Sequence, residues 1–338
     1  REVAQMALEQ KKTPRVAVGL IAGGEWYVHQ AGKTFAEIKD DPKKIAQVFI
    51  DAFRTVGQDL LWTGAGLLNY PIHCLGCAIE DDTSDSPKLV GTVIESLDSI
   101  DALNIDNALK HPTMQGIIRS HHLIADAIGK ETVILPTQWG PLTVAARILG
   151  AEALMMATIE NPDKLFELID FATELIWATG WQSFEHPDIV GMNISDPVAS
   201  GDMISPAVFR RFVAPFLKTL VERIKAKGKY ASIHICGDST PILEDILDMN
   251  PTCFSLESKV DLHTAKAQLG GRVCVLGNVS PTGKFLSGSP QEVLKEGKEC
   301  LAAWGDTPGH ILTIGCDFPK QAPLENVMAF MELKTFVR

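Results

Sequence analysis

The sequence predicts an α/β fold, a (β/α)8 TIM barrel, from three observations. Short runs rich in β-branched residues alternate with longer helical patterns, and eight such runs occur along the chain. A length of 338 residues is one that a single barrel of this class often reaches. No low-complexity tract or linker rich in proline and serine divides the chain. We therefore expect residues 1–338 to form one barrel domain.

The eight predicted strands are short and dominated by aliphatic residues. They cover residues 14–21, 58–64, 131–138, 188–195, 229–236, 252–258, 272–278 and 310–316. In barrels of this class the functional side chains gather at the C-terminal ends of the strands. Those ends carry His234, Cys236, Glu257, Asn278, Cys316 and Asp317, and Asp196 follows the fourth run. Of these, Glu257, Asp196 and Asn278 are the candidate catalytic residues.

Helical segments separate the strands, and three of them have clear boundary signals. Residues 161–184 begin with Asn-Pro and repeat apolar residues at spacings of three and four. Residues 205–228 begin with Ser205 as the predicted N-cap and end at Gly228, and residues 289–305 repeat the Ser-Pro opening. The long stretch around residues 65–130 breaks this rhythm. We expect it to be an insertion of loops and small helices over one face of the barrel.

Composition excludes some functions. The net charge of −11 and a pI near 5.3 leave no basic surface for nucleic acid. Seven cysteines in a long chain fit a reducing compartment better than a disulfide framework. The first apolar run is too short for a membrane span and has no signal-peptide pattern. A cytoplasmic protein that binds neither membranes nor nucleic acid is expected.

The segment "YASIHICGDSTP", residues 230–241, ends a predicted strand with two metal-binding residue types. His234 and Cys236 point to the same side because side chains alternate along a strand. Cys316 closes the last strand, near enough to the fifth across the barrel mouth for the ends to converge on one ion. Imidazole and thiolate are ligands that zinc favours, and Glu257 at an apolar strand end would need a partner such as a cation.

Spacing alone leaves two interpretations open. In the first, His234, Cys236 and Cys316 bind a metal ion. In the second, His234 is a hydrogen-bonded barrel residue and Cys316 a small buried one.

A competing cluster, His73, Cys74 and Cys77, has the C-x2-C spacing of zinc and redox sites, but no second cysteine pair follows it at a usable distance. His121 and His122 are adjacent on a predicted helix and point apart, which favours solvation or helix packing over metal binding. Cysteines 253, 274 and 300 are predicted to be core residues.

Five segments carry a resemblance that covers nearly the whole chain. They are "GPLTVAARILG" (140–150), "DPVASGDMISPAVFRRFVAPFLKTL" (196–220), "HICG" (234–237), "GNVSP" (277–281) and "GHILTIGCDFP" (309–319). In this order and spacing, the chain resembles the uroporphyrinogen decarboxylase superfamily. More narrowly, it is similar to the zinc-dependent branch of methylcobamide:coenzyme M methyltransferases.

Two differences from the decarboxylases select that branch. The decarboxylases bind porphyrinogen carboxylates with arginines in the loop after the first strand, and the matching segment "IAGGEWYVHQAGK" has none. They also have histidine where this chain has Cys316. The resemblance implies that His234, Cys236 and Cys316 are zinc ligands and that Glu257 fills the fourth position without substrate.

The resemblance implies methyl transfer between a methylcorrinoid (methylcobalamin), carried on a corrinoid-binding partner protein, and a small thiol such as coenzyme M. The alternative is a donor-side enzyme that moves a methyl group from a methylthiol or aryl methyl ether to a cob(I)alamin protein. A uroporphyrinogen-type decarboxylase is a further alternative. A non-enzymatic corrinoid-binding module is disfavoured because the D-x-H-x-x-G cobalamin motif is absent.

Overall fold

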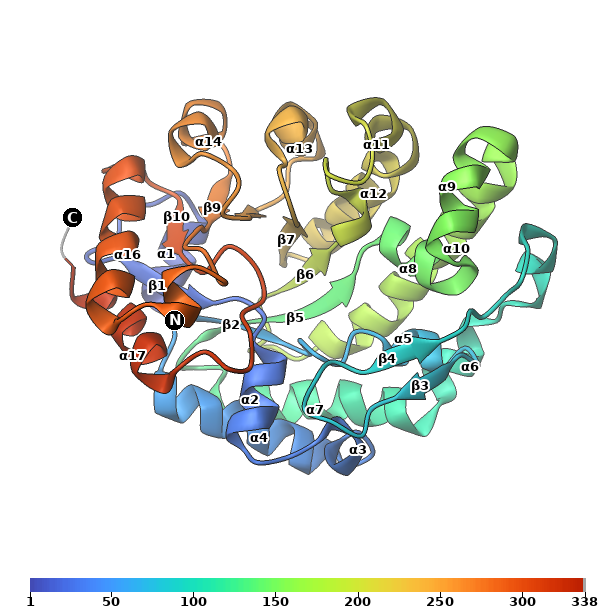
Figure 1. Ribbon diagram of the computed structural model, residues 1–338, viewed down its shortest axis with the longest axis horizontal. Helices are drawn as coiled ribbons and strands as arrows, with labels where there is room; N and C mark the ends of the chain where they lie inside the picture. The colour runs from blue at the N-terminus through green and yellow to red at the C-terminus, as the bar shows by residue number, and fades with distance from the viewer. Residues whose placement is uncertain (337–338) are drawn as a thin grey trace.

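The computed structural model describes residues 1–336, and it forms a closed barrel of eight parallel strands ringed by helices (Figure 1). The strands are β1 (Ala17–Leu20), β2 (Leu60–Thr63), β5 (Val133–Trp139), β6 (Gly191–Ser195), β7 (Tyr230–Ile235), β8 (Cys253–Leu256), β9 (Cys274–Leu276) and β10 (His310–Leu312). Neighbouring barrel strands follow one another along the chain, except that a two-stranded hairpin intervenes between β2 and β5, and β1 closes the ring against β10. Each strand falls on one of the eight predicted runs, so the predicted fold class is confirmed.

The N-terminal half of the barrel interior is filled with side chains. Leu60, Leu135 and Leu276 point into it together with residues from the other strands, and all are fully buried. The first helix, α1 (Glu2–Leu8), packs Ala4 and Leu8 into the same cluster. Helix α1 and this cluster close the end of the barrel at which the strands begin. The open end is therefore the one at which the strands finish.

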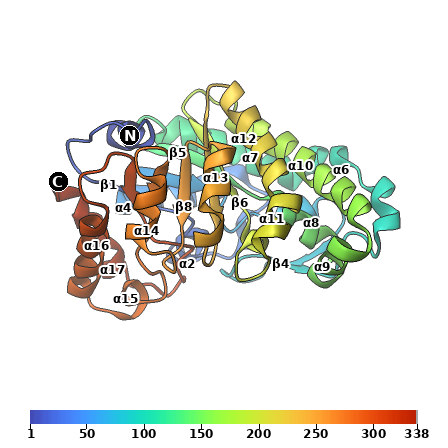
Figure 2. The same ribbon diagram turned by 90° about the horizontal axis from the view of Figure 1, so that it is seen from above.

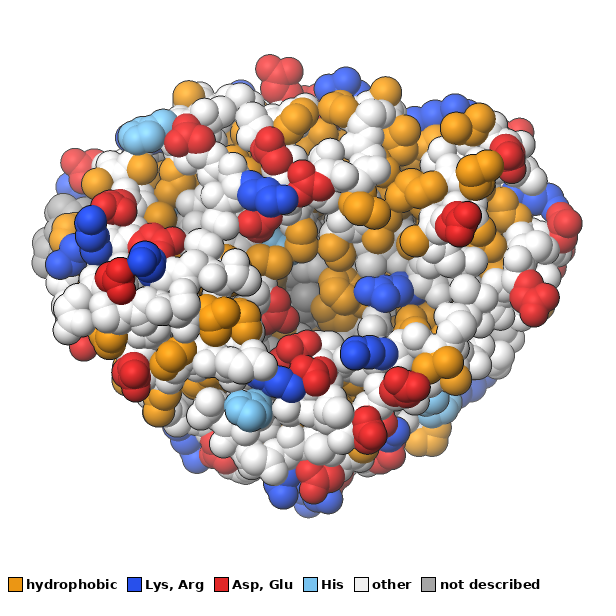
Figure 3. Space-filling model, viewed as in Figure 1, with side chains coloured by type: hydrophobic (Ala, Val, Ile, Leu, Met, Phe, Trp, Pro, Cys, Tyr) orange, Lys and Arg blue, Asp and Glu red, His pale blue; other side chains and the backbone are white. Residues whose placement is uncertain are grey.

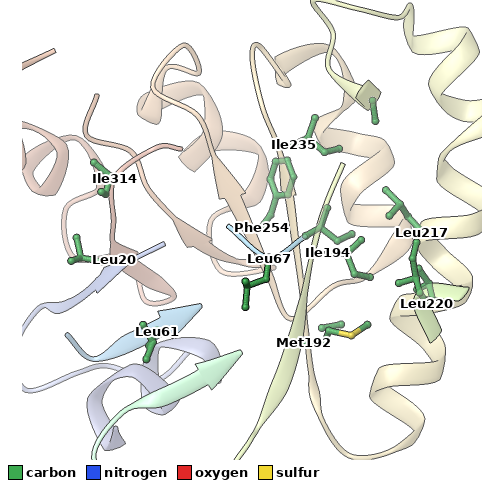
Figure 4. Packing of buried hydrophobic residues seen from close by; sticks show 14 of the residues in the cluster. Leu20, Leu61, Leu67, Met192, Ile194, Leu217, Leu220, Ile235, Phe254 and Ile314 are labelled. Carbon is green, nitrogen blue, oxygen red and sulfur yellow. The ribbon is translucent and has the colours of Figure 1, made fainter. Parts of the chain in front are cut away.

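A second core lies between the strands and the surrounding helices. Met192 and Ile194 of β6 face Leu217 and Leu220 of α12 (Ala214–Ala226), as Figure 4 shows. Burying each such side chain stabilises the fold by roughly 1.5–3 kcal/mol. Since alternate residues of a strand face opposite ways, Asn193 of β6 is directed into the barrel.

The helices of the ring follow the strands in order, and Figure 2 shows them from above. Outside the segment between β2 and β5, the other helices are α2 (Gly24–Gln30), α3 (Phe35–Ile38), α4 (Pro42–Val56), α8 (Pro141–Leu149), α9 (Ala151–Glu160), α10 (Pro162–Phe184), α11 (Pro206–Phe212), α13 (Leu243–Met249), α14 (Leu262–Leu269), α15 (Lys284–Ser287), α16 (Pro290–Trp304) and α17 (Leu324–Glu332). Short 3-10 turns are η2 (Pro197–Ala199), η3 (Thr240–Ile242) and η4 (Leu333–Thr335). No single helix in the described part of the chain is both long and apolar enough to cross a membrane, whereas α8 and α9 pass that test only together, as a pair bent by 107°.

The helix boundaries agree with the sequence in two of the three cases. Helix α10 begins after Asn161 as predicted, and α16 begins at a capping box formed by Ser289 and Glu292. The predicted helix over 205–228 is instead two helices that meet at Val213. Pro215 explains the break, because a proline removes a helical hydrogen bond and its ring clashes with the preceding turn.

The insertion after β2 is present but differs in content from the prediction. It holds α5 (Tyr70–His73), a two-stranded antiparallel hairpin of β3 (Ala78–Glu80) and β4 (Lys88–Val90), η1 (Leu97–Ala102) and α6 (Ile105–Lys110). The last part of residues 65–130 is a regular barrel helix, α7 (Pro112–Ile128), which packs along α4 and α10. The extra elements therefore end near residue 111, and they cover the side of the barrel mouth that follows β2.

Candidate metal centre

Three side chains from the ends of β7 and β10 meet at the barrel mouth. The Nε2 atom of His234 lies 3.3 Å from Sγ of Cys236 and 3.8 Å from Sγ of Cys316. The two sulfur atoms are 3.7 Å apart. Among the described residues these three form the group whose ligand atoms are mutually within 4.8 Å, the arrangement a metal ion requires. The convergence expected across the barrel mouth is therefore present.

The spacing of these atoms fits zinc. With bonds of roughly 2.3 Å to sulfur and 2.1 Å to nitrogen, a tetrahedral ion separates two sulfurs by about 3.8 Å and a sulfur from a nitrogen by about 3.6 Å. The three distances scatter around those values. A disulfide would require the sulfurs to be about 2.05 Å apart, so Cys236 and Cys316 are free thiols placed at ligand spacing. Three ligands leave the fourth position of a tetrahedral ion for a further group.

His234 is held in the orientation that metal binding needs. It is 4% exposed, and its Nδ1 lies 3.0 Å from Oγ of Ser255 on the adjacent strand β8. The ring also makes an edge contact with Trp62, with centroids 5.8 Å apart. A partner on one ring nitrogen fixes the orientation and tautomer of the other, here the Nε2 that faces the cysteines. Neither Ser255 nor Trp62 was predicted, because the strand register that brings them to His234 is not visible in the sequence.

The two thiols are electronically coupled. The hydrogen bond with Cys316 lowers the pKa of Cys236, whereas the same contact and burial raise the pKa of Cys316. The contact therefore favours ionisation of Cys236 over that of Cys316. Metal ligands bind deprotonated, so an ion at this point would displace the thiol protons.

Glu257 lies beside the cluster without joining it. Its Oε2 accepts a hydrogen bond of 2.9 Å from the backbone N–H of Gly237, and its Oε1 accepts one of 2.9 Å from the hydroxyl of Ser258. Because Gly237 follows Cys236 directly, the carboxylate fixes the backbone that carries a candidate ligand. The distance-defined cluster among residues 1–336 does not include Glu257, so its role as fourth ligand stays a prediction.

Asp196 is buried at the start of α8. Its carboxylate accepts hydrogen bonds from the backbone N–H groups of Leu142 and Thr143, at 3.1 and 2.9 Å, and from the Thr143 hydroxyl at 2.6 Å. Burial raises the pKa of this carboxyl to about 6. Gly140 is required here, since a Cβ at that position would lie 2.4 Å from the Asp196 side chain. The contacts of Asp196 therefore secure the N-terminus of α8, and it does not line the cavity described below.

Asn278 also acts on the backbone. Its Nδ2 donates to the carbonyl oxygens of Glu257, at 3.1 Å, and Val260, at 2.7 Å. The side chain is 7% exposed and does not line the cavity. Asn278 thus holds the loop after β8 that carries Glu257. A catalytic role for Asn278 or Asp196 stays a prediction, and the contacts of both residues are those of positioning groups.

A cavity of ≈ 160 Å³ opens beside the three ligands, at the hollow near the centre of Figure 3. Its walls include Trp62, Trp139 and Asp317. Asp317 accepts a 2.6 Å hydrogen bond from the backbone N–H of Gly23. Although this side chain is open to the cavity, desolvation by the surrounding protein raises its pKa to about 6. Its position after Cys316 at a strand end was the only sequence signal for it.

The competing cysteine cluster does not assemble. The Nδ1 of His73 pairs with the carbonyl oxygen of Cys77 at 2.8 Å, and the Cys77 thiol points to backbone oxygens of the β4 region. Burial raises the pKa of Cys74 to about 12, which disfavours the thiolate that a metal needs. Within the described residues this trio is not a ligand group.

The adjacent histidines of α7 separate as expected from their helical positions. His121 is buried, and His122 packs with its Nε2 2.9 Å from the carbonyl oxygen of Gln182 on α10. Cysteines 253 and 274 are fully buried strand residues, as predicted, and Cys300 is partly buried on α16.

The protein is a parallel barrel in which a His/Cys/Cys group lies at the strand ends, beside a small cavity. This arrangement makes it a candidate metalloenzyme. Comparison with known proteins gives the family: the uroporphyrinogen decarboxylase (URO-D) model matches residues 2–335. The chain therefore belongs to the uroporphyrinogen decarboxylase family.

Within the family, the similar proteins include methyltransferases. The chain is 25% identical over 335 residues to the methylcobamide:CoM methyltransferase MtaA of Methanosarcina barkeri, covering 96% of this chain and 94% of that protein. It is 27% identical over 258 residues to a methylated-thiol–coenzyme M methyltransferase of Methanosarcina mazei, covering 76% and 67%. A solved methyltransferase structure from Methanosarcina mazei superposes with a TM-score of 0.87 at 25% identity, covering 98% and 96%. The prediction of a methyltransferase of this family is confirmed.

Proposed function

We propose that this protein is a zinc-dependent methyltransferase that moves a methyl group between a corrinoid, carried by a partner protein, and a small thiol. The observation that carries the proposal is the triangle of His234, Cys236 and Cys316, whose edges of 3.3, 3.7 and 3.8 Å suit a tetrahedral zinc ion with one position free. The names of the similar methyltransferases support the same chemistry.

Each residue of the site has a defined task in this proposal. His234, Cys236 and Cys316 would hold the ion, and Ser255 orients the imidazole. When bound, zinc would lower the pKa of a substrate thiol and so supply its sulfur as a nucleophilic thiolate near neutral pH. Glu257 would occupy the fourth position until substrate arrives, and its contact with Gly237 keeps the Cys236 segment in place.

The reaction balances without an outside oxidant or reductant. The substrate sulfur attacks the methyl carbon, and a carbon–sulfur bond forms as the cobalt–carbon bond breaks. The electron pair of the broken bond stays on cobalt, which becomes cobalt(I), and the thiol proton passes to solvent. The nucleophile therefore needs to face the incoming corrinoid, which is the direction in which the barrel mouth opens.

The corrinoid is too large for a cavity of ≈ 160 Å³, so its carrier would cover the mouth from outside. The elements around the mouth support such docking. Val90 of the β3–β4 hairpin and Met203 of the loop after β6 leave 49% and 57% of their surface exposed. Both segments follow strand ends on the open side of the barrel, and exposed apolar side chains there would be buried by a partner.

Decarboxylation of a porphyrinogen is disfavoured by the same cavity. A substrate with several carboxylates needs cationic partners, and in the described part of the chain no lysine or arginine lines this cavity. Its volume is also small for a macrocycle.

Methyl transfer in the opposite sense is the second candidate. A similar protein bears the name methylated-thiol–coenzyme M methyltransferase, and the same ligand set suits the sulfur of a methylthiol donor. An aryl methyl ether would fit the apolar walls but offers no sulfur to the ligand group. Cob(I)alamin supplied with each donor distinguishes this candidate, since only donor-side activity forms methylcobalamin.

The test of the proposal is methyl transfer from free methylcobalamin. Zinc-loaded protein and a panel of small thiols should convert the methylcobalamin spectrum to that of cob(I)alamin under anaerobic conditions and yield the methyl thioether. Cys236→Ser should abolish the spectral change, and Cys77→Ser should keep it because Cys77 lies outside the ligand group. If no thiol becomes methylated and cob(I)alamin accepts methyl groups instead, the donor-side function replaces the one proposed.

A further inference from the structure

The size of the cavity beside the ligand group limits the substrate. Its volume of ≈ 160 Å³ is close to that of an engineered protein cavity, about 150 Å³, that accommodates benzene. A molecule of roughly six to eight non-hydrogen atoms therefore fills it. The wall includes His234, Cys236 and Cys316, so the reactive sulfur of such a molecule would lie at the ligand group and its remaining atoms would lie against the other walls.

Apart from Asp317, the residues of those other walls are apolar or uncharged. The apolar ones are Ala22, Trp62, Ala65, Leu68, Trp139 and Pro197, and the polar ones carry hydroxyl or amide groups. Apart from the candidate ligands His234, Cys236 and Cys316, the one ionisable group on the wall, counted over the described residues, is the carboxylate of Asp317. An anionic group in this space would meet a like charge.

The basic side chains near the mouth do not offset the negative charge of Asp317. The guanidinium of Arg147 lies over the ring of Trp139, 5.9 Å from its centroid, and is not a wall residue. Lys320 pairs with Asp85 at 2.7 Å, and Lys259 pairs with Asp202 at 2.6 Å.

The Trp139 wall is fixed in place. Its indole N–H donates to Asn69 Oδ1 at 2.8 Å, and the Asn69 amide donates to the carbonyl oxygen of Pro87 at 2.7 Å. The uncharged character of the wall is therefore built into the fold and does not depend on a mobile side chain.

We infer that the thiol substrate of this protein is small and uncharged beyond its sulfur atom, and that Asp317 discriminates against thiols with an anionic tail. The inference rests on the proposed thiol methyltransferase function and narrows it. It separates this chain from relatives whose names specify coenzyme M, because the tail of coenzyme M is a sulfonate. A sulfonate is best held by a cation, and outside the ligand group the one charged side chain on this cavity wall, counted over the described residues, is a carboxylate.

A matched series of ethanethiols that carry a different group on the far carbon tests the inference. Coenzyme M, 2-mercaptoethanol and 1-propanethiol differ in the group at the far carbon and little in the reacting sulfur. With methylcobalamin as donor, kcat/KM should be at least tenfold higher for the two uncharged thiols than for coenzyme M. Calorimetric binding to the zinc-loaded protein should rank the thiols in the same order, which provides a measurement independent of turnover.

Two variants test whether Asp317 causes the preference for uncharged thiols. In Asp317→Asn, which keeps an oxygen to accept from Gly23, the ratio of kcat/KM for coenzyme M over 2-mercaptoethanol should rise at least fivefold. In Arg147→Gln the ratio should stay the same. A lower ratio in Arg147→Gln would mean that Arg147 binds the sulfonate, and it would overturn the inference.

The inference and the proposed function fail in different ways. If thiols are methylated and coenzyme M equals or exceeds the uncharged thiols, the inference is wrong and the proposed function stands. If no thiol in the series binds or is methylated, both are wrong.

Discussion

The sulfur atoms of Cys236 and Cys316 lie 3.7 Å apart although 80 positions separate them in the chain. Barrel closure produces this relationship, because β7 and β10 end at the same mouth and their following residues turn inward. Two sulfurs at this distance are too far apart for a disulfide and close to the edge of a zinc tetrahedron. The spacing of the pair therefore supports the proposed metal centre.

The first prediction concerns metal content. Protein purified with sufficient zinc should contain about one zinc per chain, and Cys316→Ser should retain at most a small fraction of it, because two ligands bind far more weakly than three. Elemental analysis measures this directly. Cys77→Ser is the matched control, since it changes a cysteine of the competing motif and should leave the zinc content unaltered. Equal zinc in both variants would remove the proposed site.

The second prediction concerns the residue that orients His234. Ser255→Ala removes the partner of Nδ1 and should weaken zinc affinity 10–100-fold, a common magnitude for loss of such a contact. Competition with a chromophoric chelator gives the affinity. Ser232→Ala is the control, because Ser232 is a buried strand serine whose hydroxyl donates to Asn193 instead. An unchanged affinity in Ser255→Ala would show that the imidazole is oriented by other contacts.

The third prediction separates positioning from catalysis at Asp196. If its role is to hold α8, Asp196→Asn should destabilise the protein by roughly 1–3 kcal/mol, because an amide presents N–H donors to the backbone N–H groups of Leu142 and Thr143. Urea unfolding measures the loss. Thr143→Val removes a partner of Asp196 without altering the carboxylate, so it serves as the comparison. A loss of kcat above a hundredfold confined to Asp196→Asn would instead make Asp196 catalytic.

The fourth prediction concerns acid stability. His121 is 1% exposed, its ring nitrogens have no hydrogen-bond partner among the described residues, and burial lowers its pKa to about 3. The unfolded chain binds the proton with a pKa near 6.5, so unfolding takes up a proton at intermediate pH. The contribution of His121 to stability is complete above pH 6.5 and declines as the pH falls from 6.5 towards 3, by about 2 kcal/mol at pH 5.

Urea unfolding between pH 5 and 8 tests the role of His121. In His121→Met the fall in stability towards pH 5 should be shallower than in the natural sequence. His122→Gln should keep the original slope, since His122 already contacts a carbonyl oxygen at the helix surface. Parallel profiles for His121→Met and the natural sequence would assign the acid sensitivity to other groups.

The sequence predicted the barrel from local signals and placed His234, Cys236 and Cys316 at strand ends that meet. Their role as zinc ligands came from the family resemblance and stays a prediction. The eight aliphatic runs identify the strands, and the residues at strand ends converge at one mouth in this topology. The features that the sequence did not predict depend on the register of strand pairing and on the structure of loops. The contact of Ser255 with His234 follows from the pairing of β7 with β8, and the hairpin of residues 78–90 is too short to give a periodic signal.

The roles of carboxylates were harder to predict for a physical reason. Glu257 and Asp196 stand at or just after strand ends, as catalytic groups do, but their oxygens accept hydrogen bonds from backbone N–H groups. Backbone donors have no signature in the sequence, so a positioning carboxylate and a catalytic one look alike. Asp317, in contrast, reaches the cavity, and its neighbour Cys316 was the only sign of its location.

The fourth ligand is addressed by Glu257→Gln. If Glu257 completes the resting site, X-ray absorption at the zinc edge of the thiol-free variant should show one oxygen ligand lost or replaced by water. Retention of zinc is expected, because His234 and the two cysteines remain. An unchanged shell would exclude Glu257 as a ligand and leave its hydrogen bond to Gly237 as its role.

The number of sulfur ligands on zinc tests the central claim most directly. The zinc edge of the natural sequence should show two sulfur ligands without substrate, from Cys236 and Cys316, and three when a thiol that accepts the methyl group is bound. The gain of the third sulfur ligand should be accompanied by the release of close to one proton per thiol near pH 7. Calorimetry in buffers of different ionisation enthalpy counts these protons. If a methyl-accepting thiol binds while the sulfur count stays at two, zinc does not activate the substrate and the proposed chemistry is contradicted.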